Sequence, residues 1–279
     1  MITVWNEKSF YISGYWAKNL DNYVEGVMNK NTSAVLIFDG RSGLGKTTLS
    51  SQTACYINTK VKSYMKNKAP KFSLDNMHWT PDTFVDRLQN AEKGEIIILD
   101  ESMIISNRSS MSEMNRMVIN MMSMIRSKQI FVIFNINSIF DMDRNLPLHR
   151  ADVLVHLYAE DDKFAGRGRY MVIPSAKGKL KMLYILGKKY YDYSKARPAF
   201  IDKFTKFLPF NNDEYEKRKQ KAITTYFENN DTRFKSSKLK ESRDSGVRYF
   251  KKEYKLTNEE IADAFKISIR TVNRILNNN

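Results

Sequence analysis

The segment Phe38–Gln52, FDGRSGLGKTTLSSQ, decides the fold of this 279-residue chain. It follows the apolar run TSAVLI and precedes a stretch of helical character. It fits the pattern G-x-x-x-x-G-K-[ST], in which glycines let the backbone curl and point successive N–H groups at phosphates. The N-terminus of the next helix adds positive potential at the same point. The segment therefore predicts a strand, a phosphate-binding loop and a helix.

The loop supplies the candidate nucleotide ligands, which are Gly40, Gly43, Gly45, Lys46, Thr47 and Thr48. Lys46 is expected to bridge the β and γ phosphates of ATP, and the Thr47 hydroxyl to ligate Mg²⁺. ATP and Mg²⁺ are thus the expected cofactors. The alternative is a glycine-rich turn with a chance lysine, which requires four positions and the strand–helix context to coincide.

A second apolar run, EIIILDES, ends in the acidic pair Asp100 and Glu101. We expect Asp100 to hold the metal ion and Glu101 to orient and deprotonate the attacking water. The alternative is that strand ends are often acidic because they reach solvent. Small-molecule kinases share the loop but usually lack a glutamate directly after the metal-binding aspartate. The pair therefore favours ATP hydrolysis over phosphoryl transfer.

A third apolar run, QIFVIFNIN, ends in two asparagines. An amide at the tip of this strand can contact the γ-phosphate or the attacking water, and Asn135 is the first choice because it follows the apolar run directly. Asn137 and a purely turn-forming role are the alternatives. Candidate arginine fingers, acting from a neighbouring subunit, are Arg126, Arg144 and Arg150.

The order of apolar strands and amphipathic helices predicts an α/β fold with a mostly parallel sheet, a RecA-like P-loop core. The expected organisation is a helical preface (1–30), the ATPase core (31–200), a charged helical extension with a basic linker (201–243) and a small all-α module (244–279). The runs GRYMVIP and KMLYILG predict a hairpin at the sheet edge, and a Met-rich helix is expected at about 112–127.

Composition narrows the cellular setting and the partners. The formal net charge is +15, which favours a polyanionic partner such as nucleic acid over a merely lysine-rich surface. The single cysteine, Cys55, allows no intramolecular disulfide, and this fits a reducing cytoplasm. No apolar run approaches the roughly 18–20 residues of a membrane-spanning helix. The N-terminus lacks the pattern of a signal peptide.

From about Ser33 to Tyr170 the chain resembles P-loop ATPases of the FtsK/HerA type, the ring-forming DNA pumps, including small plasmid- and virus-encoded members. The resemblance rests on GRSGLGKTT, WTPDTFVDRLQNAEKGEIIILDES, NRSSMSEMNRMVINMMSMIRSKQIFVIFN and DMDRNLPLHRADVLVHLY. It implies a hexameric ring, ATP hydrolysis between subunits and double-stranded DNA in a central channel. Many of these pumps carry glutamine at the position of Asn135, and this departure leaves the AAA+ class open.

The C-terminal stretch KLTNEEIADAFKISIRTVNRILNN predicts two short helices. Thr257 and Glu260 form a capping box. The stretch resembles the helix-turn-helix of resolvases, in which the second helix enters the major groove. Its outward residues, and thus the candidate DNA contacts, are Arg270, Thr271, Asn273 and Arg274. Lys266 stands where such turns often have glycine, and a two-helix packing module is the alternative.

Two functional hypotheses remain from the sequence. The first is an ATP-driven motor of the FtsK/HerA type on double-stranded DNA, serving translocation, packaging or transfer for a virus or plasmid. The alternative is an AAA+-like, ATP-switched DNA-binding protein, such as a replication initiator, helicase loader or transposition helper, that does not translocate.

Overall fold

The computed structural model describes residues 2–5, 8–100, 125–159 and 168–277. Glu101 and nearly all of the expected Met-rich helix lie outside this part of the chain. The chain divides into two units, Met1–Gln220 and Lys221–Asn279.

The larger unit contains a seven-stranded sheet with the strand order β4-β5-β6-β3-β7-β8-β9. Its strands are β3 (Ala34–Asp39), β4 (Met77–His78), β5 (Ile96–Leu99), β6 (Phe131–Ile136), β7 (Val153–Tyr158), β8 (Arg169–Pro174) and β9 (Phe200–Lys203). Within this sheet, strands β3 to β7 pair in parallel with one another. Strand β8 pairs antiparallel with both β7 and β9. Every residue of β3, β5 and β6 is buried. The expectation of a mostly parallel, RecA-like α/β core is confirmed.

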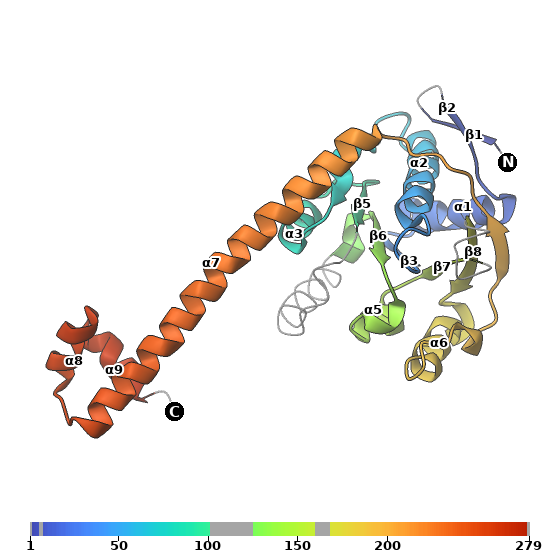
Figure 1. The fold of residues 1–279 in the computed structure, drawn as a ribbon. Helices are drawn as coiled ribbons and strands as arrows, with labels where there is room; N and C mark the ends of the chain where they lie inside the picture. Colours follow the sequence, from blue (N-terminus) through green and yellow to red (C-terminus); the bar gives the residue numbers. More distant parts are fainter. Residues whose placement is uncertain (1, 6–7, 101–124, 160–167, 278–279) are drawn as a thin grey trace. The chain divides into compact units, whose positions relative to one another are not determined.

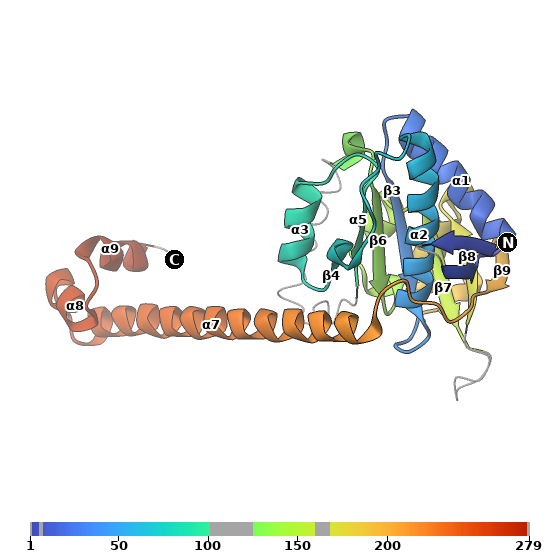
Figure 2. The same cartoon turned by 90° about the horizontal axis from the view of Figure 1, so that it is seen from above.

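Helices cover both sides of this sheet. They are α1 (Gly14–Asn29), α2 (Lys46–Tyr64), α3 (Pro81–Gln89), α5 (Asn145–His149) and α6 (Lys179–Gly187). Figure 1 shows α1 and α2 on one side and α6 on the other, and Figure 2 shows α1 next to α2. Short 3₁₀ turns complete the connections: η1 (Leu74–Asn76), η3 (Ile125–Lys128), η4 (Ile139–Asp141), η5 (Ala176–Gly178) and η6 (Tyr193–Lys195). A separate antiparallel pair, β1 (Ile2–Trp5) and β2 (Lys8–Tyr11), precedes α1.

Two sequence-based expectations for this unit are wrong. KMLYILG forms part of helix α6 and not the second strand of a hairpin, and β9 takes that place beside β8. Leu180 and Leu183 of α6 are buried, so the helix has an apolar face that packs on the core. The run KMLYILG is too short to reveal this helical period in the sequence. Strand β9 extends the sheet of the core past residue 200. The N-terminal segment 1–30 contains the strands β1 and β2 as well as the helix α1.

The smaller unit is all α-helical. Helix α7 (Asn212–Glu253) starts in the larger unit, and α8 (Asn258–Phe265) and α9 (Ile269–Asn277) follow it. The core of this unit consists of Val247, Ile261, Ala262, Val272 and Ile275. The expected helical extension and basic linker are both helical, since the segment 212–253 is one helix throughout, and the end of α7 supplies Val247 to this core.

Candidate nucleotide and metal site

Sheet order brings the predicted site residues to one edge. Strand β6 lies between β3, which leads into the phosphate loop, and β5, which ends before Asp100. Asn135 of β6 is in register with Phe38 of β3. Because the carboxyl ends of parallel strands meet at one edge, the loop, the acidic residue and the asparagine converge there.

Two glycines of the loop occupy positions that other residues cannot easily take. Gly40 has φ 139°, and a Cβ atom there would lie 2.4 Å from the Leu157 carbonyl oxygen. Gly45 is the left-handed N-cap of α2, and its Cβ atom would lie 2.8 Å from the Phe204 ring. No side chain caps the start of α2, so its first N–H groups are available to an anion. Gly43 also has a positive φ and lines the pocket with Thr48.

The Lys46 side chain lies folded over its own loop. Its Nζ donates hydrogen bonds to the Gly40 carbonyl oxygen (2.6 Å), the Arg41 carbonyl oxygen (3.2 Å) and the Asn137 side-chain oxygen (3.1 Å). All three acceptors are oxygen atoms, the kind of atom that a nucleotide phosphate also presents. The ammonium group is thus held at the phosphate loop by protein oxygens.

Thr47 and Asp100 form the part of the site that fits a metal ion. The Thr47 hydroxyl donates to both carboxylate oxygens of Asp100, at 3.0 Å and 3.2 Å. Asn135 donates its side-chain N–H to Asp100 Oδ1 at 2.7 Å and to the Ser50 hydroxyl at 2.9 Å. Among the described residues no group of three His, Cys, Asp or Glu side chains could hold a metal alone. One hydroxyl and one carboxylate fit Mg²⁺, which takes its remaining ligands from phosphates and water.

The two asparagines at the end of β6 differ in position. Asn135 is fully buried beneath Asp100, whereas Asn137 contacts Lys46 at the phosphate loop. Asp39, at the end of β3, fixes the backbone just after Asn137. Its Oδ2 accepts from the Ile139 N–H at 2.9 Å, and its Oδ1 contacts His156 Nδ1 at 2.8 Å. Asn137, the alternative from the sequence, therefore lies at the phosphate loop, whereas Asn135 lies at Asp100.

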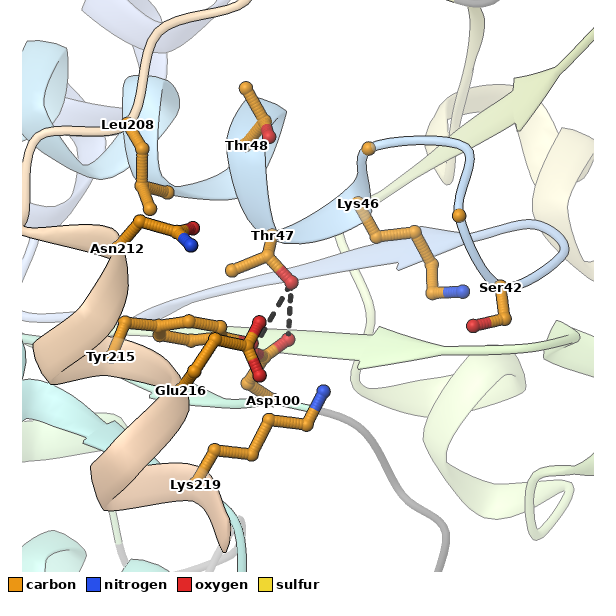
Figure 3. A pocket seen from close by; sticks show the side chains of 12 residues that line it. Ser42, Lys46, Thr47, Thr48, Asp100, Leu208, Asn212, Tyr215, Glu216 and Lys219 are labelled. Carbon is orange, nitrogen blue, oxygen red and sulfur yellow. Dashed lines mark hydrogen bonds between the residues drawn. The ribbon is translucent and has the colours of Figure 1, made fainter.

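Helix α7 forms a wall of the pocket that the sequence did not predict. The pocket has a volume of about 250 Å³. Its lining combines the loop and Asp100 with five residues at or just before the start of α7: Leu208, Asn212, Tyr215, Glu216 and Lys219. Figure 3 shows Tyr215, Glu216 and Lys219 facing Thr47 and Asp100. The segment NNDEYEKRK is uniformly polar, so no sequence signal separated these residues from a solvated helix.

Tyr215 contacts Asp100 directly. Its hydroxyl donates to Asp100 Oδ2 at 2.6 Å, and its ring packs edge-on against Trp79 with 5.8 Å between centroids. Burial, followed by the neighbouring Asp100 carboxylate, raises the pKa of Tyr215 well above its ordinary value. The hydroxyl therefore stays protonated and acts as a donor.

Neither Arg144 nor Arg150 is among the residues that line the pocket at the phosphate loop. Arg150 lines a second pocket of about 210 Å³ with Ser33 and Asp152, which precede β3 and β7. This is the amino end of the strands, opposite the phosphate loop. Arg126 belongs to η3, which precedes β6, and Arg144 is exposed at the start of α5. The side chain of Arg126 and all of Glu101 lie outside the described residues.

The candidate DNA contacts lie on α9 of the smaller unit. Arg270, Asn273 and Arg274 are exposed, whereas Thr271 is half-buried and its hydroxyl lies 2.9 Å from that of Ser268. Asn273 also accepts a hydrogen bond from Asn258 at 2.7 Å. The turn between α8 and α9 contains Lys266 with φ 51° and ψ 47°, the left-handed conformation that glycine usually takes.

Comparison with known proteins supports the ATPase interpretation. Residues 36–158 match the family model of the ATPase family associated with various cellular activities (AAA). No curated protein and no solved structure is similar enough to count as a match. Together with the site geometry, this match identifies the core as a P-loop ATPase that binds and hydrolyses nucleotide. In the described part of the chain, no helix combines the length and apolarity needed to span a membrane.

Proposed function

We propose that the chain is an ATP-driven motor on double-stranded DNA, of the FtsK/HerA type, that translocates, packages or transfers DNA for a virus or plasmid. The observation that carries this proposal is helix α7. Its first turns line the nucleotide pocket, and its last turns supply Val247 to the core of the smaller, helical unit. A single helix therefore links the residues that bind ATP to the unit that we expect to bind DNA.

Charge and exposure support DNA as the ligand of the smaller unit. Residues 221–279 contain 13 Lys or Arg against 8 Asp or Glu. Arg270 and Arg274 are exposed on α9, while Val272 and Ile275 hold its other face in the core. This arrangement matches a recognition helix whose basic side chains reach phosphates and base edges.

In the nucleotide site, Lys46 and the start of α2 would hold the phosphates, and Thr47 and Asp100 would hold Mg²⁺. Bound Mg²⁺ supplies neutralisation of the charge that develops on the transferring phosphoryl group. Glu101 would then take the proton of the attacking water. An arginine from a neighbouring subunit, with Arg126, Arg144 and Arg150 as candidates, would complete the site in a hexameric ring.

A second function is favoured by a specific observation. Residues 36–158 match the AAA family model. Strand β6, which lies between β3 and β5 in the sheet, carries Asn135 at its end where many FtsK/HerA pumps carry glutamine. Both features fit an ATP-switched DNA-binding protein, such as an initiator, helicase loader or transposition helper. Such a protein uses ATP to assemble on DNA and does not move along it.

One experiment distinguishes the motor from the switch. ATP hydrolysis is measured with and without long linear duplex DNA, together with displacement of a triplex-forming strand from that DNA. The motor predicts stimulated hydrolysis and strand displacement, both absent in Lys46→Ala. Slow hydrolysis without displacement would reject the motor and favour the switch.

DNA binding by the smaller unit is tested separately with Arg270→Ala/Arg274→Ala. Each lost phosphate contact should lower the slope of log affinity against log salt by about 1. The double variant is therefore expected to bind duplex DNA roughly tenfold or more weakly at low salt. The matched control is Lys252→Ala, which removes a positive charge from exposed α7 in the same unit. Equal binding by the double variant and this control would exclude α9 as the DNA contact.

A further inference from the structure

Three protein donors surround the carboxylate of Asp100. Asn135 donates to Oδ1, Tyr215 donates to Oδ2, and the single proton of the Thr47 hydroxyl is shared between the two oxygens. A metal ion or one of its water ligands that binds Asp100 therefore competes with these donors.

Burial and chemistry determine which donor can leave. Asn135 is fully buried and also bonded to Ser50, so it has no room to withdraw. The Thr47 hydroxyl has two lone pairs and a proton, so it can ligate a metal and still donate to Asp100. Tyr215 is the remaining donor, and it lines the open pocket from α7.

The start of α7 is attached in a way that permits this movement. Arg218 pairs with Asp75 at 2.6 Å, but this ion pair is exposed and contributes little stability, and the second ion pair of Arg218, with Glu214, lies within α7 itself. The segment before α7 is held more firmly, since Gln52 donates to the carbonyl oxygens of Thr205 (2.6 Å) and Phe207 (3.0 Å). Apart from Tyr215, which packs on Trp79, the start of α7 is thus held by an exposed ion pair next to an anchored segment.

We propose that Tyr215 acts as a metal-responsive latch, by which we mean a contact that metal binding breaks. In the nucleotide-free protein its hydroxyl is hydrogen-bonded to Asp100. Binding of a magnesium–nucleotide complex displaces this hydroxyl together with the first turns of α7. This inference rests on the proposed nucleotide and metal site. The added element is the hydrogen bond between Tyr215 and Asp100, through which metal binding moves the start of α7.

The test compares Tyr215→Phe with the wild type in equilibrium binding of a fluorescent ATP analogue, with Mg²⁺ and with EDTA. The ring and its packing on Trp79 are retained, and only the hydroxyl is lost. Because a hydrogen bond to a charged group opposes metal binding in the wild type alone, the variant should bind the magnesium complex about tenfold more tightly. Its affinity in EDTA should equal that of the wild type.

Tyr184→Phe is the matched control, because Tyr184 is also buried and donates its hydroxyl to the Met142 carbonyl oxygen on the α6 side of the sheet. It should bind like the wild type under both conditions. Hydrogen exchange of amides 212–220 gives a second readout. Exchange should rise in the wild type when the magnesium complex binds, and it should be raised in Tyr215→Phe before any addition.

The outcomes separate the latch from the site on which it rests. If the wild type binds the analogue but Tyr215→Phe shows unchanged or weaker magnesium-dependent affinity, Tyr215 does not compete with the metal and the latch is rejected. If the wild type binds no nucleotide in either condition, the proposed nucleotide site itself fails.

Discussion

Replacing Asn135 with aspartate tests whether the Asp100 carboxylate is held as the structure shows. The Asn135 side-chain nitrogen lies 2.7 Å from Asp100 Oδ1, and both residues are buried. Asn135→Asp puts a second carboxylate at that distance. Two charges 2.7 Å apart repel by about 6 kcal/mol at an effective dielectric constant of 20. The pair is therefore expected to take up a proton rather than remain doubly charged.

Proton uptake limits the loss of stability. Keeping one aspartic acid protonated, against an ordinary pKa of about 3.9 for an unfolded chain, costs about 4 kcal/mol at pH 7 and about 1.5 kcal/mol at pH 5. The sign follows from linkage, because the folded variant binds a proton that the unfolded chain releases above pH 4. The free energy of unfolding of Asn135→Asp, relative to wild type, should therefore fall as pH rises from 5 to 7.

Urea unfolding of both proteins at pH 5, 6 and 7 measures this difference. The double variant Asp100→Asn/Asn135→Asp restores one amide and one carboxylate and should recover most of the stability at pH 7. A penalty below 1 kcal/mol at pH 7, or one that does not change with pH, would refute the placement of Asn135 against Asp100.

Further predictions concern the phosphate loop, the catalytic water, a buried histidine and a helix cap. Lys46→Ala should abolish binding of a fluorescent ATP analogue, since it removes the phosphate contact; unchanged hydrolysis would reject the site. Glu101→Gln should bind ATP normally but hydrolyse it about 100-fold or more slowly in a steady-state assay; loss of binding would indicate a structural role. Burial, with a smaller contribution from Arg87, lowers the pKa of His78 to about 4, so stability should fall as pH decreases from about 6.5 to 4. In urea unfolding at pH 7 and 4.5, His78→Gln should lose much of this dependence, about 3 kcal/mol at most, and an unchanged dependence would contradict the assignment. Thr257→Ala removes the cap hydrogen bond to the Glu260 N–H and should cost about 1 kcal/mol in the calorimetric unfolding of the smaller unit, whereas Asn277→Ala should not.

Local patterns in the sequence were sufficient for the parallel core and the phosphate loop. Continuous apolar runs predict buried strands, and the loop's glycines and Lys46 have fixed spacing because the phosphate geometry demands it. The capping box of α8 is equally local and agrees with the structure. Such features depend on neighbours within a few residues, so the sequence alone contains them.

Only the tertiary structure decided which distant residues meet. The short run KMLYILG has no distinctive period, and its packing against β8 determined that it forms a helix. Asn135 and Asn137 are only two positions apart, yet Asn135 lies within β6 and is buried under Asp100, whereas Asn137 follows the end of the strand and contacts Lys46. Tyr215 lies 115 positions from Asp100, and no local pattern specifies a contact that forms only when α7 packs against the end of the sheet.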